Sequence, residues 1–223
     1  MHLENIRENQ GGRFDRYVIG SLIIVFTFFV AQLPYIFAVI NAVGIGQLDS
    51  LDIAGILQAL PPNTTLVLML LPFAVVAVLV LGIIRKLHHI SIRAFITSRT
   101  KIDWKRIAFA FGSIVLLNFL FFVISYFSNP SDFQWNFDPQ AFAILFLIAI
   151  VLVPLQTSAE ELFFRGYLMQ GFGQVFKHRI FPLLITSLMF GLMHFGNPEI
   201  DKLGPLLMVS YVSMGFFFGI ITL

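Results

Sequence analysis

Long runs of apolar residues, separated by short polar segments, dominate the chain. The runs cover residues 18–43, 66–84, 107–127, 140–155, 180–195 and 206–223. A helix that crosses a bilayer needs about 20 mostly apolar residues. The first run is interrupted only by Gln32 and Pro34, and no signal-peptide cleavage site follows it. The pattern therefore predicts an all-α, polytopic membrane helix bundle with about six spans.

Basic residues are distributed unevenly among the polar segments. Of the 14 Lys and Arg, all but Arg165 and Lys202 fall in the amino-terminal segment 1–17, the loop 85–106 or the turn before residue 180. Cytoplasmic loops of membrane proteins carry an excess of Lys and Arg. We therefore expect the amino terminus and the loop 85–106 to be cytoplasmic, and residues 18–139 to form the first three spans around that loop.

The composition agrees with this class of protein and excludes others. Hydrophobic residues make up 58% of the chain and charged residues only 12%, whereas a soluble domain carries roughly a quarter charged residues. The expected partner is thus the lipid bilayer, and a net charge of +2 gives no reason to expect nucleic acid. The absence of Cys excludes disulfides, thiolate metal ligands and a cysteine nucleophile.

Ionisable residues interrupt the apolar pattern at one place, where Glu160, Glu161 and Arg165 lie in an aromatic, helix-compatible stretch. Charges at membrane depth mark a functional site or an internal ion pair. Glu161 and Arg165 are four residues apart and can pair on one helix face. Glu160 points about 100° away, on a face shared with Gln156, Phe163, Phe164 and Tyr167. The alternative is an interfacial ion cluster in which Arg165 extends towards the headgroups.

His194, in the fifth apolar run, makes a functional site more plausible. Glu160 and His194 are equally distant in sequence from Lys177. Two antiparallel helices joined there would bring both residues to one depth, where a carboxylate and an imidazole can act as a general-base site. The alternative for His194 is a hydrogen-bonded packing residue. His88 and His89, in the basic loop, are expected to be interfacial residues.

These residues resemble the CPBP family of intramembrane proteases, which includes type II CAAX prenyl endopeptidases and bacterial Abi, or bacteriocin-immunity, proteins. The family motif EExxxR is matched by Glu160, Glu161 and Arg165, and the motif FxxxH by Phe190 and His194. The resemblance implies a catalytic core over residues 140–223 and a bacterial plasma membrane as the location.

The resemblance also implies an activity, namely hydrolysis of peptide bonds in membrane-associated peptides or lipidated proteins. The substrates would be prenylated or of the bacteriocin type. Glu160 would activate water, His194 would position the water or the carbonyl, and Glu161 and Arg165 would hold the geometry. The resemblance leaves open whether the site is metal-free or binds a divalent metal such as zinc through Glu160 and His194.

The chain departs from the family in one respect. The family's third motif, a histidine followed four residues later by Asn or Asp, has no match after His194. We therefore expect a chain truncated before the family's last spans, with an incomplete site. Two alternative functions remain open, a non-catalytic immunity or scaffold protein of the same fold and a proton-coupled transporter.

Overall fold

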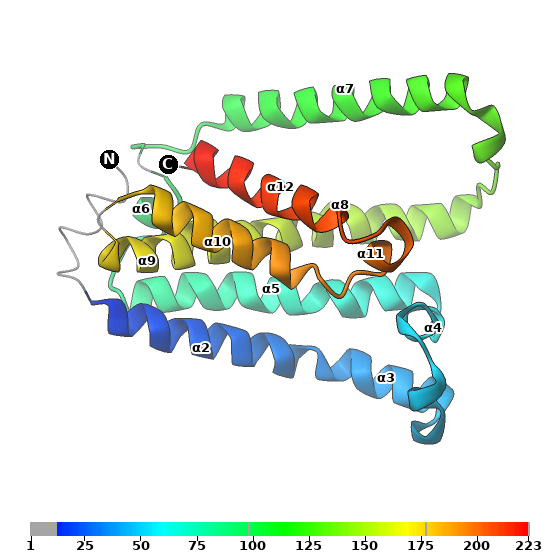
Figure 1. Cartoon of the computed structure of the whole chain (residues 1–223), viewed down its shortest axis with the longest axis horizontal. Helices are drawn as coiled ribbons and strands as arrows, with labels where there is room; N and C mark the ends of the chain where they lie inside the picture. The colour runs from blue at the N-terminus through cyan, green and yellow to red at the C-terminus, as the bar shows by residue number, and fades with distance from the viewer. Residues whose placement is uncertain (1–12, 98, 177, 223) are drawn as a thin grey trace.

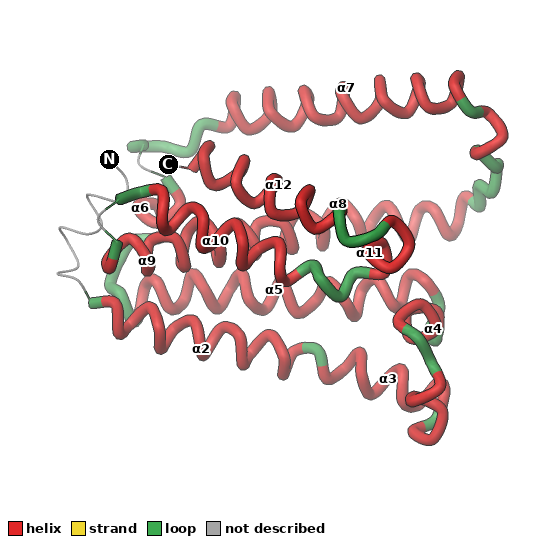
Figure 2. Tube along the Cα trace, in the orientation of Figure 1, coloured by secondary structure: helices red, strands yellow, loops and turns green. Residues whose placement is uncertain are grey.

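The computed structural model describes residues 13–97, 99–176 and 178–222. Helices connected by short loops make up this part of the chain, and none of its residues forms a strand (Figure 2). The elements are α2 (Phe14–Ala31), α3 (Leu33–Val43), η1 (Ile45–Ser50), α4 (Ile53–Gln58), α5 (Pro62–Lys86), α6 (Ile92–Ile96), α7 (Trp104–Ser128), η2 (Pro130–Asp132), α8 (Pro139–Glu161), the π-helix η3 (Leu162–Leu168), α9 (Met169–Val175), α10 (Ile180–Met193), α11 (Pro198–Leu203) and α12 (Leu207–Thr222).

The long helices confirm the predicted class of membrane helix bundle. Among the described residues, four helical segments are long and apolar enough to cross a bilayer, namely Phe14–Val43, Pro62–Lys86, Trp104–Ser128 and Pro139–Val175. The fifth and sixth predicted spans are the shorter apolar helices α10 and α12. The first segment is divided into α2 and α3 at Gln32, beside the Pro34 that interrupts its apolar run.

Side chains in the loops fix where several helices begin. Asp138 accepts hydrogen bonds from the backbone N–H groups of Gln140 and Ala141, and Pro139 occupies the first position of α8. Asp103 accepts one from Arg106 at the start of α7. Such residues satisfy N–H groups that the first turn of a helix leaves without partners. The cap at Asp138 therefore fixes the start of the helix whose far end carries Glu160 and Glu161.

The bundle core lies between α2, α5 and the α8–η3–α9 rod. α5 packs against α2 on one side and α8 on the other, as Figure 1 shows. Ile24, Val80, Ile84 and Tyr167 are at most 2% exposed in this core. Because lipid is as apolar as these side chains, close packing rather than removal from water holds such helices together.

Glycines allow α10 and α12 to lie close together. A Cβ atom on Gly215 of α12 would lie 3.0 Å from the carbonyl oxygen of Ser187 in α10. Small residues at helix contacts are typical of membrane bundles, because they let two backbones approach closely. This close contact brings α12 next to the stretch that carries the ionisable residues.

α7 differs from the other long helices, because none of its residues is buried within the described chain. It lies along one side of the molecule in Figure 1, apart from the α2–α5 pair. Two of its polar side chains bond within the helix, since Ser113 donates to the Phe109 carbonyl and Asn118 to the Ile114 carbonyl. Satisfying polar groups internally is what a lipid-facing helix requires.

The two ends of the bundle differ in the segments they carry. The start of α2, the α6 region and the end of α9 lie at one end in Figure 1, and α4, α11 and the α7–α8 connection lie at the other. The first group contains the segments whose basic residues predict a cytoplasmic location. The basic loops and the loops with few basic residues therefore lie at opposite ends of the bundle, as predicted. Which end faces the cytoplasm stays a prediction.

Candidate active site

The EExxxR stretch lies where the α8 helix changes its winding. Glu160 and Glu161 are the last two residues of α8, and Arg165 lies inside the π-helix Leu162–Leu168. π-Helical turns are rare and are frequently found at functional sites. Nothing in the apolar pattern predicted this change, because the residues are compatible with either winding.

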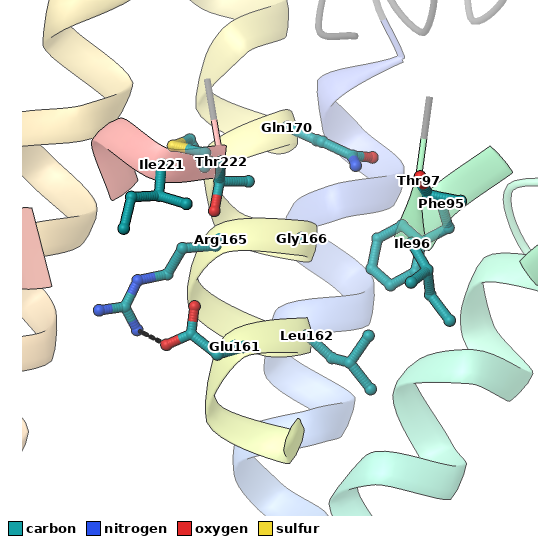
Figure 3. A pocket seen from close by; sticks show the side chains of 11 residues that line it. Phe95, Ile96, Thr97, Glu161, Leu162, Arg165, Gly166, Gln170, Ile221 and Thr222 are labelled. Atoms are coloured by element: carbon teal, nitrogen blue, oxygen red, sulfur yellow. Dashed lines mark ion pairs between the residues drawn. The ribbon is translucent and has the colours of Figure 1, made fainter. Parts of the chain in front are cut away.

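Arg165 is buried and paired with Glu161, as the spacing predicted. Its Nη1 atom lies 2.9 Å from Oε1 of Glu161 (Figure 3), and its side chain is 3% exposed. Nη1 nevertheless has no well-aligned hydrogen bond among the described residues, so this contact is an ion pair by distance only. Nη2 donates to the Gly215 carbonyl of α12 at 3.3 Å. The guanidinium thus joins the first motif to the last described helix rather than extending to the headgroups.

Aromatic contacts join the two sequence motifs. The guanidinium carbon of Arg165 lies 4.2 Å from the centre of the Phe190 ring, within the range of a cation–π contact. The Phe190 ring in turn lies 4.6 Å from the His194 ring, between centroids. The FxxxH spacing therefore places one aromatic ring between the arginine and the histidine.

His194 is the residue directly after α10, and its orientation is fixed on two sides. Nδ1 lies 2.8 Å from the Phe190 carbonyl oxygen. A carbonyl only accepts, so Nδ1 carries the proton, and Nε2 is the basic nitrogen of the neutral ring. The ring stacks on Tyr211 of α12 at 4.4 Å, and Tyr211 accepts a hydrogen bond from Asn197. Sequence reasoning missed Tyr211, although a Ser–Tyr pair inside an apolar run was a signal.

Glu160 has a polar partner on its own helix and lies in an otherwise apolar surrounding. Gln156, one turn earlier, donates from Nε2 to Oε1 of Glu160 at 3.1 Å. Glu160 is also within electrostatic range of His194 and Arg165. No hydrogen bond or ion pair joins Glu160 to His194 among the described residues, so their meeting at one depth stays a prediction, and Lys177, around which it was inferred, lies outside those residues.

An apolar groove of about 400 Å³ lies beside Glu160. Residues of α2, α5, α8, η3 and α10 line it, and Glu160 is the one charged residue among them. Phe163 and Phe164 line it as well, as the shared helix face predicted. The groove therefore offers an apolar ligand a surface next to the residue that carries the carboxylate.

Tyr167 and His88 occupy other positions than expected. Tyr167 does not line the groove with Glu160, because the wider π-turn rotates it by about 100° from the face expected for an α-helix. Its hydroxyl lies 2.9 Å from Nε2 of His88 and donates to the Arg16 carbonyl at 3.2 Å. His88 is 5% exposed rather than interfacial. Burial, aided by the Arg16 charge, lowers the pKa of His88 to about 4.

The donor set near Glu160 is small for a metal. A catalytic zinc ion usually has three protein ligands, and no group of three His, Cys, Asp or Glu side chains comes together in residues 13–97, 99–176 and 178–222. Glu160 and His194 alone do not make such a shell.

Comparisons with known proteins agree with the motifs. The family described as type II CAAX prenyl endopeptidase Rce1-like matches residues 139–223. A protein of Bacillus subtilis (strain 168) named YyaK, itself uncharacterised, is 32% identical over 207 residues, which cover 90% of this chain and 67% of YyaK. No solved structure matches. On the residues of both motifs and these similarities, the chain belongs to the Rce1-like type II CAAX prenyl endopeptidase (CPBP) family, whose domain it carries over residues 139–223.

Proposed function

We propose that the chain is an intramembrane endopeptidase in which Glu160 activates the water that attacks a peptide bond. The observation that carries this proposal is the position of Glu160, which lies in an apolar groove, accepts a hydrogen bond from Gln156 and is within electrostatic range of His194. A carboxylate and an imidazole in such a site can handle the protons of a hydrolysis reaction.

In the proposed reaction, Glu160 takes one proton from water while the water oxygen bonds to the carbonyl carbon. Nε2 of His194 accepts a hydrogen bond from the same water and orients it. Glu160 then passes the proton to the amide nitrogen as the carbon–nitrogen bond breaks, which leaves a carboxylic acid and an amine. Glu161 and Arg165 are positioning residues, since their ion pair and the Arg165–Gly215 bond connect η3 to α12.

The groove also indicates the chemistry of the substrate. Apart from Glu160, apolar side chains dominate its lining, which suits a membrane-associated peptide or the lipid group of a lipidated protein. The basic loop and the amino terminus are proposed to be cytoplasmic, in the plasma membrane of a bacterium. Single cysteines at Lys101 and Ser131 test this orientation, because only the first should react with a membrane-impermeant thiol reagent applied from the cytoplasmic side.

Cleavage assays on purified protein test the activity. Prenylated CAAX peptides and a library of membrane peptides are incubated with the reconstituted chain and analysed by mass spectrometry. We expect cleavage that Glu160→Gln and His194→Ala abolish and that the exposed-site controls Asp132→Asn and His178→Ala leave intact. No product from well-folded protein across the library would refute the proposal and favour the non-catalytic alternative, and proton flux in the same vesicles would favour a transporter.

A further inference from the structure

A basic surface pocket lies where the loop after α6 meets the first turn of α7. Its volume is about 620 Å³, and the consecutive residues 99–105 line it. Arg99, Lys101 and Lys105 contribute positive charge to the lining, and Asp103 contributes negative charge. None of these residues belongs to the EExxxR or FxxxH motif, so the function proposed above does not account for the pocket.

Hydrogen bonds and ion pairs hold the loop around the pocket in place. Nη1 of Arg93, in α6, donates to the carbonyl oxygens of Arg99 and Thr100 at 3.2 and 3.0 Å. Oδ2 of Asp103 lies 3.2 Å from Nη1 of Arg99 and 3.2 Å from Nε of Arg106. Two guanidinium groups of the same loop thus already face the carboxylate of the pocket, and its charge balance stays positive.

The ammonium groups of Lys101 and Lys105 remain available for a ligand. Both side chains are exposed, and neither forms a hydrogen bond or an ion pair within the described part of the chain. A Lys ammonium is a compact point charge that binds phosphate groups. The charge of the pocket therefore fits an anion, and phosphate in particular.

The apolar surface next to the pocket indicates which phosphate compound fits. Trp104 lines the pocket and is 70% exposed. It begins a stripe on one face of α7 that continues through Ile107, Phe111 and Ile114, all exposed. Trp side chains are enriched at the level of the lipid headgroups. A free phosphate would leave this stripe unused, whereas a phospholipid would place its phosphate in the pocket and its acyl chains along the stripe.

We propose that the pocket formed by residues 99–105 binds the headgroup phosphate of an anionic phospholipid, with Lys101 and Lys105 as its ligands. The acyl chains lie along the stripe that Trp104 begins. Because the charge balance of the pocket is positive, a headgroup without a cationic part binds better than a zwitterionic one. The site is independent of the proposed peptidase activity.

Trp104 is a natural reporter of this lipid, because the chain has only two tryptophans. Trp135→Phe leaves Trp104 as the one indole in the chain. Trp104→Phe leaves Trp135, which lies in the α7–α8 connection at the opposite end of the bundle (Figure 1). Each variant is reconstituted into phosphatidylcholine vesicles that contain a brominated lipid, either phosphatidylglycerol or phosphatidylcholine. Bromine quenches the fluorescence of an indole that it contacts.

We expect brominated phosphatidylglycerol to quench Trp104 about threefold more than brominated phosphatidylcholine when each makes up about one tenth of the lipid, since one basic residue near the surface favours an anionic lipid about fivefold. Trp135 should be quenched equally by both lipids. Equal quenching of Trp104 by the two lipids would overturn the proposal.

Two double variants separate a defined site from general attraction to anionic lipid. Lys101→Gln with Lys105→Gln should remove the excess quenching of Trp104. Arg85→Gln with Lys86→Gln removes the same charge from the basic loop 85–106 but outside the pocket, and should leave the excess intact. Equal loss in both double variants would overturn the site. Thermal unfolding of each variant confirms that it is folded.

A soluble anion is distinguished from a lipid by added salt. Because salt screens charges, sodium phosphate and sodium chloride of equal ionic strength should weaken the excess quenching to the same extent. If phosphate alone abolished the excess, the pocket would bind a soluble phosphate and the lipid proposal would be wrong. None of these measurements depends on peptide cleavage, so this proposal and the proposed function can fail separately.

Discussion

The guanidinium carbon of Arg165 lies 4.2 Å from the centre of the Phe190 ring. This contact joins the two motifs that the sequence carries on separate apolar runs. It also explains how a guanidinium can be buried in this bundle, because the ring, the Glu161 carboxylate and the Gly215 carbonyl surround it. The two motifs are therefore parts of one packed unit.

A double-mutant cycle should detect this contact as a coupling in stability. Arg165→Lys and Phe190→Leu are each expected to destabilise the protein, and the pair should destabilise it less than the two single losses combined. We expect a coupling of about 0.5–2 kcal/mol, the range of cation–π contacts. Unfolding in detergent measures it. Phe181→Leu, at an exposed position of the same helix, serves as the control, and additive losses would contradict the prediction.

Gln156 should matter for activity more than for folding. Its amide donates to the Glu160 carboxylate at 3.1 Å, and hydrogen bonds to charged groups contribute about 1.5–3 kcal/mol. Gln156→Leu is therefore expected to lower kcat/KM by about 10- to 100-fold in the peptide assay. Thr157→Val, one position further on an exposed part of the helix, should have little effect. Equal losses in both variants would indicate a general disturbance of α8.

Gly215→Ala should weaken the contact between α10 and α12. The added Cβ would lie 3.0 Å from the Ser187 carbonyl oxygen and 3.1 Å from its Cα, and backbone atoms cannot move aside as a side chain can. Overpacking of this kind costs about 1–3 kcal/mol, measurable as a lower unfolding temperature. Gly82→Ala, where no atom lies within 4 Å of the new Cβ, should be neutral or stabilising. A neutral Gly215→Ala would refute the tight packing.

The buried His88 should make stability depend on pH in the acidic range. Its pKa is lowered from 6.5 to about 4 in the folded protein, so between these values the unfolded chain binds a proton that the folded chain does not. Stability is then complete above pH 6.5 and falls by about 3 kcal/mol as the pH drops to about 4. Unfolding temperatures across this range should show the slope.

His88→Phe keeps a ring against Tyr17, with which the imidazole is in ring contact, and removes the proton site. It should flatten this part of the pH profile, whereas His178→Gln, at an exposed position, should leave the slope as it is. An unchanged slope in His88→Phe would assign the acid sensitivity to other groups.

The sequence was sufficient to predict the features that follow from periodicity and charge. The apolar runs predicted the helices, and the spacing of Glu161 and Arg165 predicted their ion pair, whereas the division of the first span at Gln32 was not predicted. The catalytic roles of Glu160 and His194 stay predictions.

Other features could not be predicted, because they depend on how helices meet. The stacking of His194 on Tyr211 and the bond from Arg165 to Gly215 both involve α12. Apart from the Ser–Tyr pair, the mostly apolar sequence of this helix does not specify its rotation about its axis. His88 is buried against Tyr17 and Tyr167, and Tyr167 lies in the π-helix, which the sequence did not predict. When the partner of a side chain is a carbonyl or hydroxyl group on a distant helix, no regular spacing of residues in the sequence reveals the contact.

The π-helix has a consequence for comparing this chain with its relatives. A π-turn contains one residue more than the α-turn it replaces, so η3 acts on the following residues as a one-residue insertion would. A relative with an ordinary α-helix here would present the residues before the turn on the same face but those after it on a different one. An alignment of such chains would need a single gap between Glu161 and Met169, and without it residues of different orientation would be compared as equivalents.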